Sequence, residues 1–288
     1  MQVSDNATRG KRVIVRIDVR DGRVAHEVKL TGLRDPRDPA ELAARYQAEG
    51  ADEILLLDAS ASLEGRRQLP ELVRRTAASV FIPLIAGGTL ATLDEVDELL
   101  RAGAGRARLN DAAVADPELL RHAVERHGSE RILLAIDVRE ERRQIEIEAR
   151  PEVDASHAAG PPPVHNWFRV FTHGGITPTP LDAITWARRG VELGAGEVLI
   201  TSIDRQGSAH GYDLELTARL NEAVDVAVIA GGGAGSAQHI RELFLLAGAD
   251  GALAGGLFHD GRVTVREVKG VLADAGIPVR LEPPPLLS

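Results

Sequence analysis

VIVRIDVRDGR (residues 13–23) is a β-branched, apolar run that ends in an aspartate, and a similar stretch returns later in the chain as LLAIDVREER (residues 133–142). Asp137 of the second stretch lies 119 residues after Asp18 of the first. Similarity between distant segments indicates a chain built from repeated structural units. We therefore predict two related halves.

Two further pairs of segments repeat, with a different spacing. DEILLLDAS and GEVLITSID place Glu53 and Glu197 144 residues apart, and IAGG returns with the same spacing at residues 85–88 and 229–232. The second half therefore holds 25 extra residues between Asp137 and Glu197. Alternating QIEIEA and WFRVF in that interval predict an inserted hairpin at about residues 140–172. It fits a lid over an active site and a tolerated surface insertion equally well.

Short apolar runs alternate with amphipathic segments along the whole chain. The runs fall at residues 12–18, 53–58, 80–86, 106–110, 131–137, 197–202, 226–231 and 252–254. Helical patterns fall between them at residues 38–49, 92–101, 116–127, 181–193, 213–224, 236–247 and 264–275. Eight strand–helix units in about 250 residues are typical of a (β/α)8 TIM barrel. We predict this α/β fold for residues 1–288 as one domain with a short tail at about 282–288; a doubly wound sheet is the alternative.

Composition excludes several classes of protein. The chain has no cysteine, which rules out disulfides, thiolate metal sites and a cysteine nucleophile. Its net charge of −9, without a basic block, argues against nucleic-acid and anionic-membrane partners. No apolar run reaches the ~18 residues of a spanning helix, and the polar start is no signal peptide. We expect a cytoplasmic protein without a metal or other cofactor.

Asp18 and Asp137 are the first candidates for catalysis. Each ends a predicted strand, and strand ends of a barrel meet at a common mouth. Two carboxylates that face one substrate from opposite sides can act as general acid and general base. The alternative is that each aspartate caps the loop that follows it.

Glycine turns follow three of the predicted strands, and their backbone N–H groups can bind phosphate without a basic side chain. Their order predicts one phosphate site in each half. The candidates are Gly87, Gly88 and Asn110 in the first half, and residues 231–233 (including Gly232 and Gly233), Gly255 and Gly256 in the second.

The order of motifs is specific enough to indicate a family. IDVRDGRV, LRDPRDPAELA, DEILLLDASAS, LNDAAVADP, AIDVR, TSIDRQGS, GYD, IAGGGAG and ALAGGLFH stand in sequence between about Arg12 and Leu281. This set resembles the cyclase subunit of imidazole glycerol phosphate synthase, a barrel family of histidine biosynthesis. The sister isomerase of that pathway shares the half-barrel repeat but fits less well.

The resemblance implies a lyase that uses ammonia from a glutaminase partner. It would cyclise and cleave a phosphorylated ribulosyl-type substrate, with Asp18 and Asp137 as the acid–base pair. It adds Thr201 and Gly207 to the substrate-binding residues. It also implies an ammonia gate at the other end of the barrel, made by Arg12, Glu53, Arg106 and Glu197. These four charges fit a buried structural network as well.

Several mouth positions depart from the family pattern. Arg16 stands two before Asp18 where the family has a small residue or Cys, His26 replaces a lysine, and Gln206 replaces an aspartate. Asp111 follows Asn110 where the family has a hydroxyl, which places a carboxylate beside a phosphate site unless it only caps the following helix. We predict that these residues, with Asp58 and His173, determine specificity.

The departures favour a cyclase with an altered substrate over the ordinary histidine-pathway enzyme. Two other hypotheses stay open. One is a sugar-phosphate isomerase that uses the same two aspartates. The other is a non-catalytic barrel that regulates a glutaminase partner.

Overall fold

The computed structural model describes residues 10–25, 37–59, 67–144 and 164–282. His26 and the predicted ASHAAGPPP loop lie outside these ranges, as does most of the predicted tail. No helix in the described ranges is long and apolar enough to cross a membrane. The extent of the domain as a whole stays a prediction.

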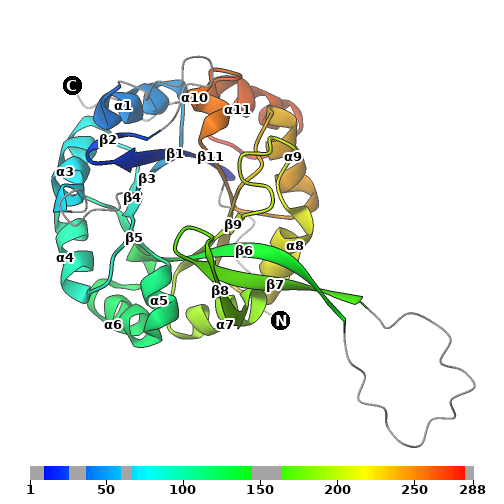
Figure 1. The fold of residues 1–288 in the computed structure, drawn as a ribbon. Helices are drawn as coiled ribbons and strands as arrows, with labels where there is room; N and C mark the ends of the chain where they lie inside the picture. Colours follow the sequence, from blue (N-terminus) through cyan, green and yellow to red (C-terminus); the bar gives the residue numbers. More distant parts are fainter. Residues whose placement is uncertain (1–9, 26–36, 60–66, 145–163, 283–288) are drawn as a thin grey trace, which may run out of the picture.

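A closed ring of eight parallel strands forms the centre of the described structure, which confirms the predicted barrel (Figure 1). In ring order these are β1 (Arg12–Arg20), β3 (Glu53–Asp58), β4 (Leu84–Gly87), β5 (Arg106–Leu109), β6 (Ile132–Gln144), β9 (Glu197–Ser202), β10 (Ala227–Gly231) and β11 (Gly251–Ala254). The pairing of β5 with β6 and of β1 with β11 closes the ring. Because β1 and β6 are four places apart, they lie on opposite walls.

Helices surround the ring and cover its outer face (Figure 1). They are α1 (Pro39–Glu49), α3 (Leu69–Ser79), α4 (Leu93–Arg101), α5 (Asp111–Ala115), α6 (Pro117–His127), α7 (Ala183–Glu192), α8 (Leu214–Ala223), α9 (Ala237–Leu246), α10 (Gly256–His259) and α11 (Val265–Asp274). A short 3-10 turn, Ser129–Arg131, precedes β6. Capping sets the helix starts: Thr92 and Thr264 form capping boxes with Glu95 and Glu267. All seven predicted helical segments are confirmed within two residues at each end, and α3, α5 and α10 are additions.

Alternating residues of each strand point into the barrel, where they form layers. At the amino-terminal end of the strands, which we call the lower end, lie Arg12, Glu53, Arg106 and Glu197. Above them is a separate apolar cluster of Ile14, Leu55, Ile85, Leu133, Ala135, Leu199, Ile229 and Leu253, all at most 3% exposed. The next inward positions carry charge again, with Arg16 on β1 and Arg108 on β5. One dry layer thus separates two charged ones.

Two strand boundaries differ from the prediction by more than two residues. The run that begins at Val80 becomes strand only at Leu84, because Pro83 has no N–H and the backbone N–H groups of Phe81 and Ile82 donate to the Gln47 side chain. The strand expected to end at Asp137 continues to Gln144. It continues because it gains an antiparallel partner.

That partner is β7 (Val164–Thr172), which pairs with β6 from Asp137–Phe171 to Gln144–Val164. The described part of the interval is therefore an antiparallel strand pair, whose first strand is the extension of a barrel strand and ends where the predicted QIEIEA strand begins. Two short strands were not predicted: β8 (Thr177–Asp182), which follows β7, and β2 (Arg23–Val24), which pairs with β1. In Figure 1 the β6–β7 arm runs outward from the barrel wall past the ring of helices. The residues beyond Gln144 that were predicted to continue the strand lie outside the described ranges.

Ile14→Ala tests the apolar layer. Ile14 is fully buried between the two charged layers, so the substitution leaves a cavity that cannot collapse easily. We expect a loss of about 3 kcal/mol in the free energy of unfolding, measured by urea denaturation. Val271→Ala on the partly exposed face of α11 is the control, with a change of about 0.5 kcal/mol or less. Equal effects would contradict the layered interior.

Candidate active site

Asp18 and Asp137 lie on opposite walls of the barrel, Asp18 near the carboxyl end of β1 and Asp137 in the middle of β6, where the pairing with β7 begins. Each is held by a basic neighbour. The Arg16 Nε donates to Asp18 Oδ1 at 2.7 Å, and Asp18 remains 37% exposed at its side chain. Asp137 is more buried: Asn110 Nδ2 donates to its Oδ2 at 2.9 Å, and Arg108 Nη2 lies 3.8 Å from its Oδ1. The pair therefore consists of one accessible and one buried carboxylate.

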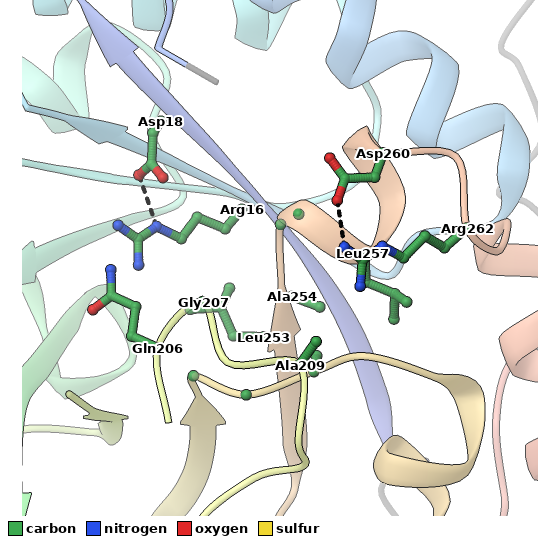
Figure 2. Close-up of a pocket in the computed structure, with 15 residues that line it drawn as sticks. Arg16, Asp18, Gln206, Gly207, Ala209, Leu253, Ala254, Leu257, Asp260 and Arg262 are labelled. Carbon is green, nitrogen blue, oxygen red and sulfur yellow. Dashed lines mark hydrogen bonds and ion pairs between the residues drawn. The ribbon is translucent and has the colours of Figure 1, made fainter. Parts of the chain in front are cut away.

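A pocket of about 270 Å³ opens beside Asp18 (Figure 2). It collects residues that the sequence assigned to substrate binding in the second half. Among its lining residues are Arg16, Asp18, Gln206, Gly207, Gly232, Gly233, Gly255 and Gly256. An ion pair between Arg262 and Asp260, 3.0 Å apart, lies at the far side in Figure 2. The pocket thus combines a carboxylate, a cation and exposed backbone.

Glycine is required by the geometry at Gly232 and Gly233. Both have positive φ, 92° and 100°, which residues with a side chain rarely adopt. A side chain at Gly233 would also collide with the carbonyl oxygen of Gly211, whose own N–H donates to the Gly233 carbonyl. These glycines bring bare backbone to the pocket wall, as an anion-binding turn needs. Thr201 is close by on β9, buried, and paired in register with Asp137.

The first-half candidates do not line this pocket. A Cβ at Gly88 would lie 2.8 Å from the Asp58 carbonyl oxygen, and one at Gly87 would lie 2.8 Å from Arg108 Cβ. Close approach of neighbouring strands therefore explains both glycines, and their role in phosphate binding stays a prediction. Asp58 lines a second pocket of about 230 Å³ together with Thr89 and Arg67.

Asp111 does not cap a helix, which corrects that alternative. The N-cap of α5 is Asn110, without a side-chain capping bond, and Asp111 is the first helical residue. Its Oδ2 instead accepts from the backbone N–H of His173 at 3.0 Å. Strand β7 ends just before His173, so this bond joins the base of the hairpin to the start of α5, which follows the neighbouring strand β5. His173 itself is exposed, has a φ of 54° and contacts Thr172 Oγ1.

The four charges at the lower end form a closed ring of ion pairs. Arg12 Nη1 lies 3.0 Å from Glu53 Oε1, and its Nη2 donates to Glu197. Arg106 likewise bridges the second oxygens of Glu53 and Glu197. Each arginine therefore touches both glutamates, and the four formal charges cancel.

Burial and pairing act in opposite directions on this ring. Burial lowers the pKa of Arg12, but Glu197 and Glu53 together outweigh it and raise the pKa above its usual value. Burial raises the pKa of Glu197, and Arg106 and Arg12 oppose this rise only in part. The ring is therefore held by mutual neutralisation in a dry environment.

Arg108 is the site residue that sequence reasoning missed. It stands two positions after Arg106 and two before Asn110, so strand alternation puts all three on the inward face. The same alternation identified Arg16 from Asp18, and it would have found Arg108. No group of three or more His, Cys, Asp or Glu side chains that could hold a metal occurs within the described ranges.

Fold and site together define a two-halved α/β barrel with paired carboxylates at its mouth. A family model described as "Histidine biosynthesis protein" matches residues 12–264. The chain belongs to this family, and the resemblance seen in its motifs is confirmed.

Three relatives are similar to the chain over 270 residues, which is 94% of the chain and 98% of each relative. Each is named imidazole glycerol phosphate synthase subunit HisF. The relative from Myxococcus xanthus (strain DK1622) is 50% identical and the one from Methanopyrus kandleri 48%. The relative from Metallosphaera sedula is 45% identical.

Arg12→Met tests the ring of ion pairs at the lower end of the barrel, which we call the lower ring. It leaves two buried glutamates with one cation, and we expect a loss of about 3–5 kcal/mol in the free energy of unfolding near pH 8. The pKa of Glu197 then rises further above its unfolded value of 4.5. A carboxyl with a raised folded pKa binds its proton first in the folded state, so stability recovers as the pH falls towards that unfolded value.

Urea denaturation of wild type and Arg12→Met at pH 8 and pH 5 measures both effects. The loss should be clearly smaller at pH 5. Arg101→Met, at a side chain 73% exposed on α4, is the control and should change stability by about 0.5 kcal/mol or less at either pH. A loss that is the same at both pH values would argue against uncompensated carboxylates.

Proposed function

We propose that the chain is the cyclase subunit of an imidazole glycerol phosphate synthase-type lyase, in which Asp18 and Asp137 exchange protons with the substrate. The observation that carries the proposal is the placement of these two carboxylates on opposite walls of one mouth, in a chain 50% identical to a subunit of that name. The reaction would use ammonia to form a ring and cleave a phosphorylated ribulosyl-type substrate.

The unequal surroundings of the two aspartates support an acid–base division. Asp18 is partly exposed beside the pocket, whereas Asp137 is buried and receives a hydrogen bond from Asn110. Groups with different environments can hold a proton at different stages of a reaction. A substrate between them would give a proton to one carboxylate and receive one from the other.

Phosphate would bind to backbone N–H groups at Gly232, Gly233, Gly255 and Gly256, with Gly207 and Thr201 nearby. The pocket places these glycines beside Asp18. The first-half site at Gly87, Gly88 and Asn110 is the weaker part of the proposal, because Asp111 puts a carboxylate next to it. Asp58, His173, Gln206 and His26 remain proposed specificity residues.

Ammonia would come from a glutaminase subunit, since the relatives are named as subunits of a synthase. We propose that it enters at the lower end, where Arg12, Glu53, Arg106 and Glu197 form the ion-pair ring. Passage of ammonia would require the ring to open, which would break ion pairs that share the same four side chains. The same ring also fits a purely structural role. The protein would act in the cytoplasm.

Arg16 and Asp111 favour an altered substrate over the ordinary histidine-pathway intermediate. Both add charge to the mouth, and Arg16 is bonded to one of the two proposed catalytic groups. An isomerase with the same aspartates and a non-catalytic regulator of a glutaminase are the other hypotheses. Dependence on ammonia separates the cyclase from the isomerase.

Turnover with ammonium salts in place of glutamine tests the cyclase. We expect ring formation that depends on ammonium, and a loss of about 10²–10⁴-fold in kcat for Asp18→Asn and Asp137→Asn. Asp94→Asn, at an exposed residue in the first turn of α4, is the control and should keep the wild-type rate.

The histidine-pathway intermediate serves as the first substrate in this assay. A wild-type rate on it would establish the ordinary enzyme and refute the altered substrate. Turnover that persists in Asp137→Asn, or needs no ammonium, would refute the proposed acid–base chemistry.

Gly256→Asp tests the phosphate site. No atom lies within 4 Å of a Cβ built at Gly256, so a side chain fits there, but a carboxylate would repel a bound phosphate. We expect KM to rise by about tenfold with a smaller change in kcat. Gly256→Ala keeps the N–H group and adds no charge, so it should behave like wild type. Equal KM values in the two variants would place the phosphate elsewhere.

A further inference from the structure

Arg108 is a buried cation whose hydrogen-bonding capacity is largely unused. Its side chain is 7% exposed, and its closest ion-pair contact, with Asp137, is 3.8 Å, too long for a hydrogen bond. Its Nε has no hydrogen-bond partner among the described residues. Burial lowers the pKa of Arg108, which expresses the cost of keeping this charge away from water.

Arg16 belongs to the same group of charges. Asp137, Arg16, Asp111 and Asp18 all act electrostatically on Arg108, so the two arginines lie in one charged cluster. Within the described ranges, Arg16 uses only its Nε for a side-chain bond, to Asp18. The side chain of Arg16 is 21% exposed and lines the pocket (Figure 2). N–H groups of both arginines thus remain available.

The small size of Gly87 makes room for the Arg108 side chain. Strand register runs from Asp18 to Leu57, from Leu57 to Gly87 and from Gly87 to Arg108, across three neighbouring pairs. Gly87 is the small member of this row, and a Cβ there would lie 2.8 Å from Arg108 Cβ. A bare glycine therefore lets a large cation turn towards the centre of the mouth.

Arg108 also makes no hydrogen bond to the buried acceptor atoms of the residues near it. Asn110 Oδ1 and Asp111 Oδ1 are buried without a hydrogen-bond partner in the described part of the chain. Buried polar atoms nearly always find partners, and a group left without one marks a missing ligand or water. Here unsatisfied donors and acceptors adjoin each other without pairing.

We propose that Arg108 and Arg16 form a central oxyanion site, which binds a carboxylate or phosphate group of the substrate between the two proposed catalytic aspartates. An arginine fork matches the two oxygens of such a group, and charge-assisted bonds of this kind are the stronger ones. The two arginines bind through side chains, whereas the glycine turns, which share a pocket with Arg16, bind through backbone. Asn110 and Asp111 would accept from a donor carried by the same ligand.

The inference deepens the proposed function and rests on it for the identity of the mouth as an active site. It narrows the substrate class to molecules with an oxyanion close to the reacting atoms, in addition to a phosphate at the glycine turns. A binding measurement tests it without turnover. Anion binding in an inactive protein would therefore leave this inference standing and remove only the cyclase.

Spectra of the full chain labelled with ¹⁵N-arginine give the direct test. Arg108→Gln and Arg16→Gln assign the two Nε–H signals, and sodium phosphate or sodium acetate is titrated against sodium chloride at equal ionic strength. We expect both signals to shift with the added oxyanion and the Arg108 signal to exchange more slowly with water. The dissociation constant of the bound oxyanion should be about tenfold to a hundredfold larger in Arg108→Gln than in wild type.

Arg108→Lys keeps the charge without the fork and should bind with intermediate affinity, whereas Arg101→Gln on the outer surface should bind like wild type. A response to acetate assigns a carboxylate, and a response to phosphate alone assigns a phosphate group. Signals that move with neither anion overturn the proposal. So does phosphate affinity that is equal in Arg108→Gln and wild type, because the glycine turns would then hold the anion. If Arg108→Gln does not fold, the wild-type shifts and Arg108→Lys still decide.

Discussion

Every inward side chain of a closed barrel enters a space with little water, so a charge placed there needs a partner in the same space. The lower ring meets this condition completely, since Arg12 and Arg106 each bridge Glu53 and Glu197. The apolar layer above it, which includes Ile14 and Leu199, separates this ring from the mouth. The two charged layers of the interior differ in how completely their charges are paired.

The upper layer differs because its charges are only partly matched. Arg16 is bonded to Asp18 at hydrogen-bond distance, but Arg108 and Asp137 stand apart at 3.8 Å, and buried polar atoms beside them lack partners. The balanced layer needs no further partner for its charges, whereas the partly matched layer is the one in which we propose an oxyanion site.

Local patterns in the sequence were enough to predict most of the fold. Glu53–Asp58 and Glu197–Ser202 are strands with the predicted bounds, because apolar residues buried on both faces leave little ambiguity. The start of β4 was wrong, since the Gln47 side chain takes the N–H groups of Phe81 and Ile82, and no local pattern reveals so distant a contact.

The site was predictable to a similar depth. Asp18 and Asp137 followed from the predicted strand ends, although β6 continues beyond Asp137, and the glycines Gly232, Gly233, Gly255 and Gly256 of the second half line one pocket; the roles of all these residues stay predictions. The bond between Asp111 and the His173 backbone could not be foreseen, because it joins residues 62 apart in the sequence that the pairing of β6 with β5 and with β7 brings together. Arg108 could have been predicted from alternation alone.

The β6–β7 arm leaves the barrel without changing the number of strands in the ring. Below Asp137, β6 is bounded by β5 and β9; above it, β7 takes over one of these edges. The arm therefore continues a single barrel strand, and bonds to Asp111 and Asp204 hold its base, while the ring closes without its outer end. The ring of strands would therefore close in the same way whatever the length of the arm.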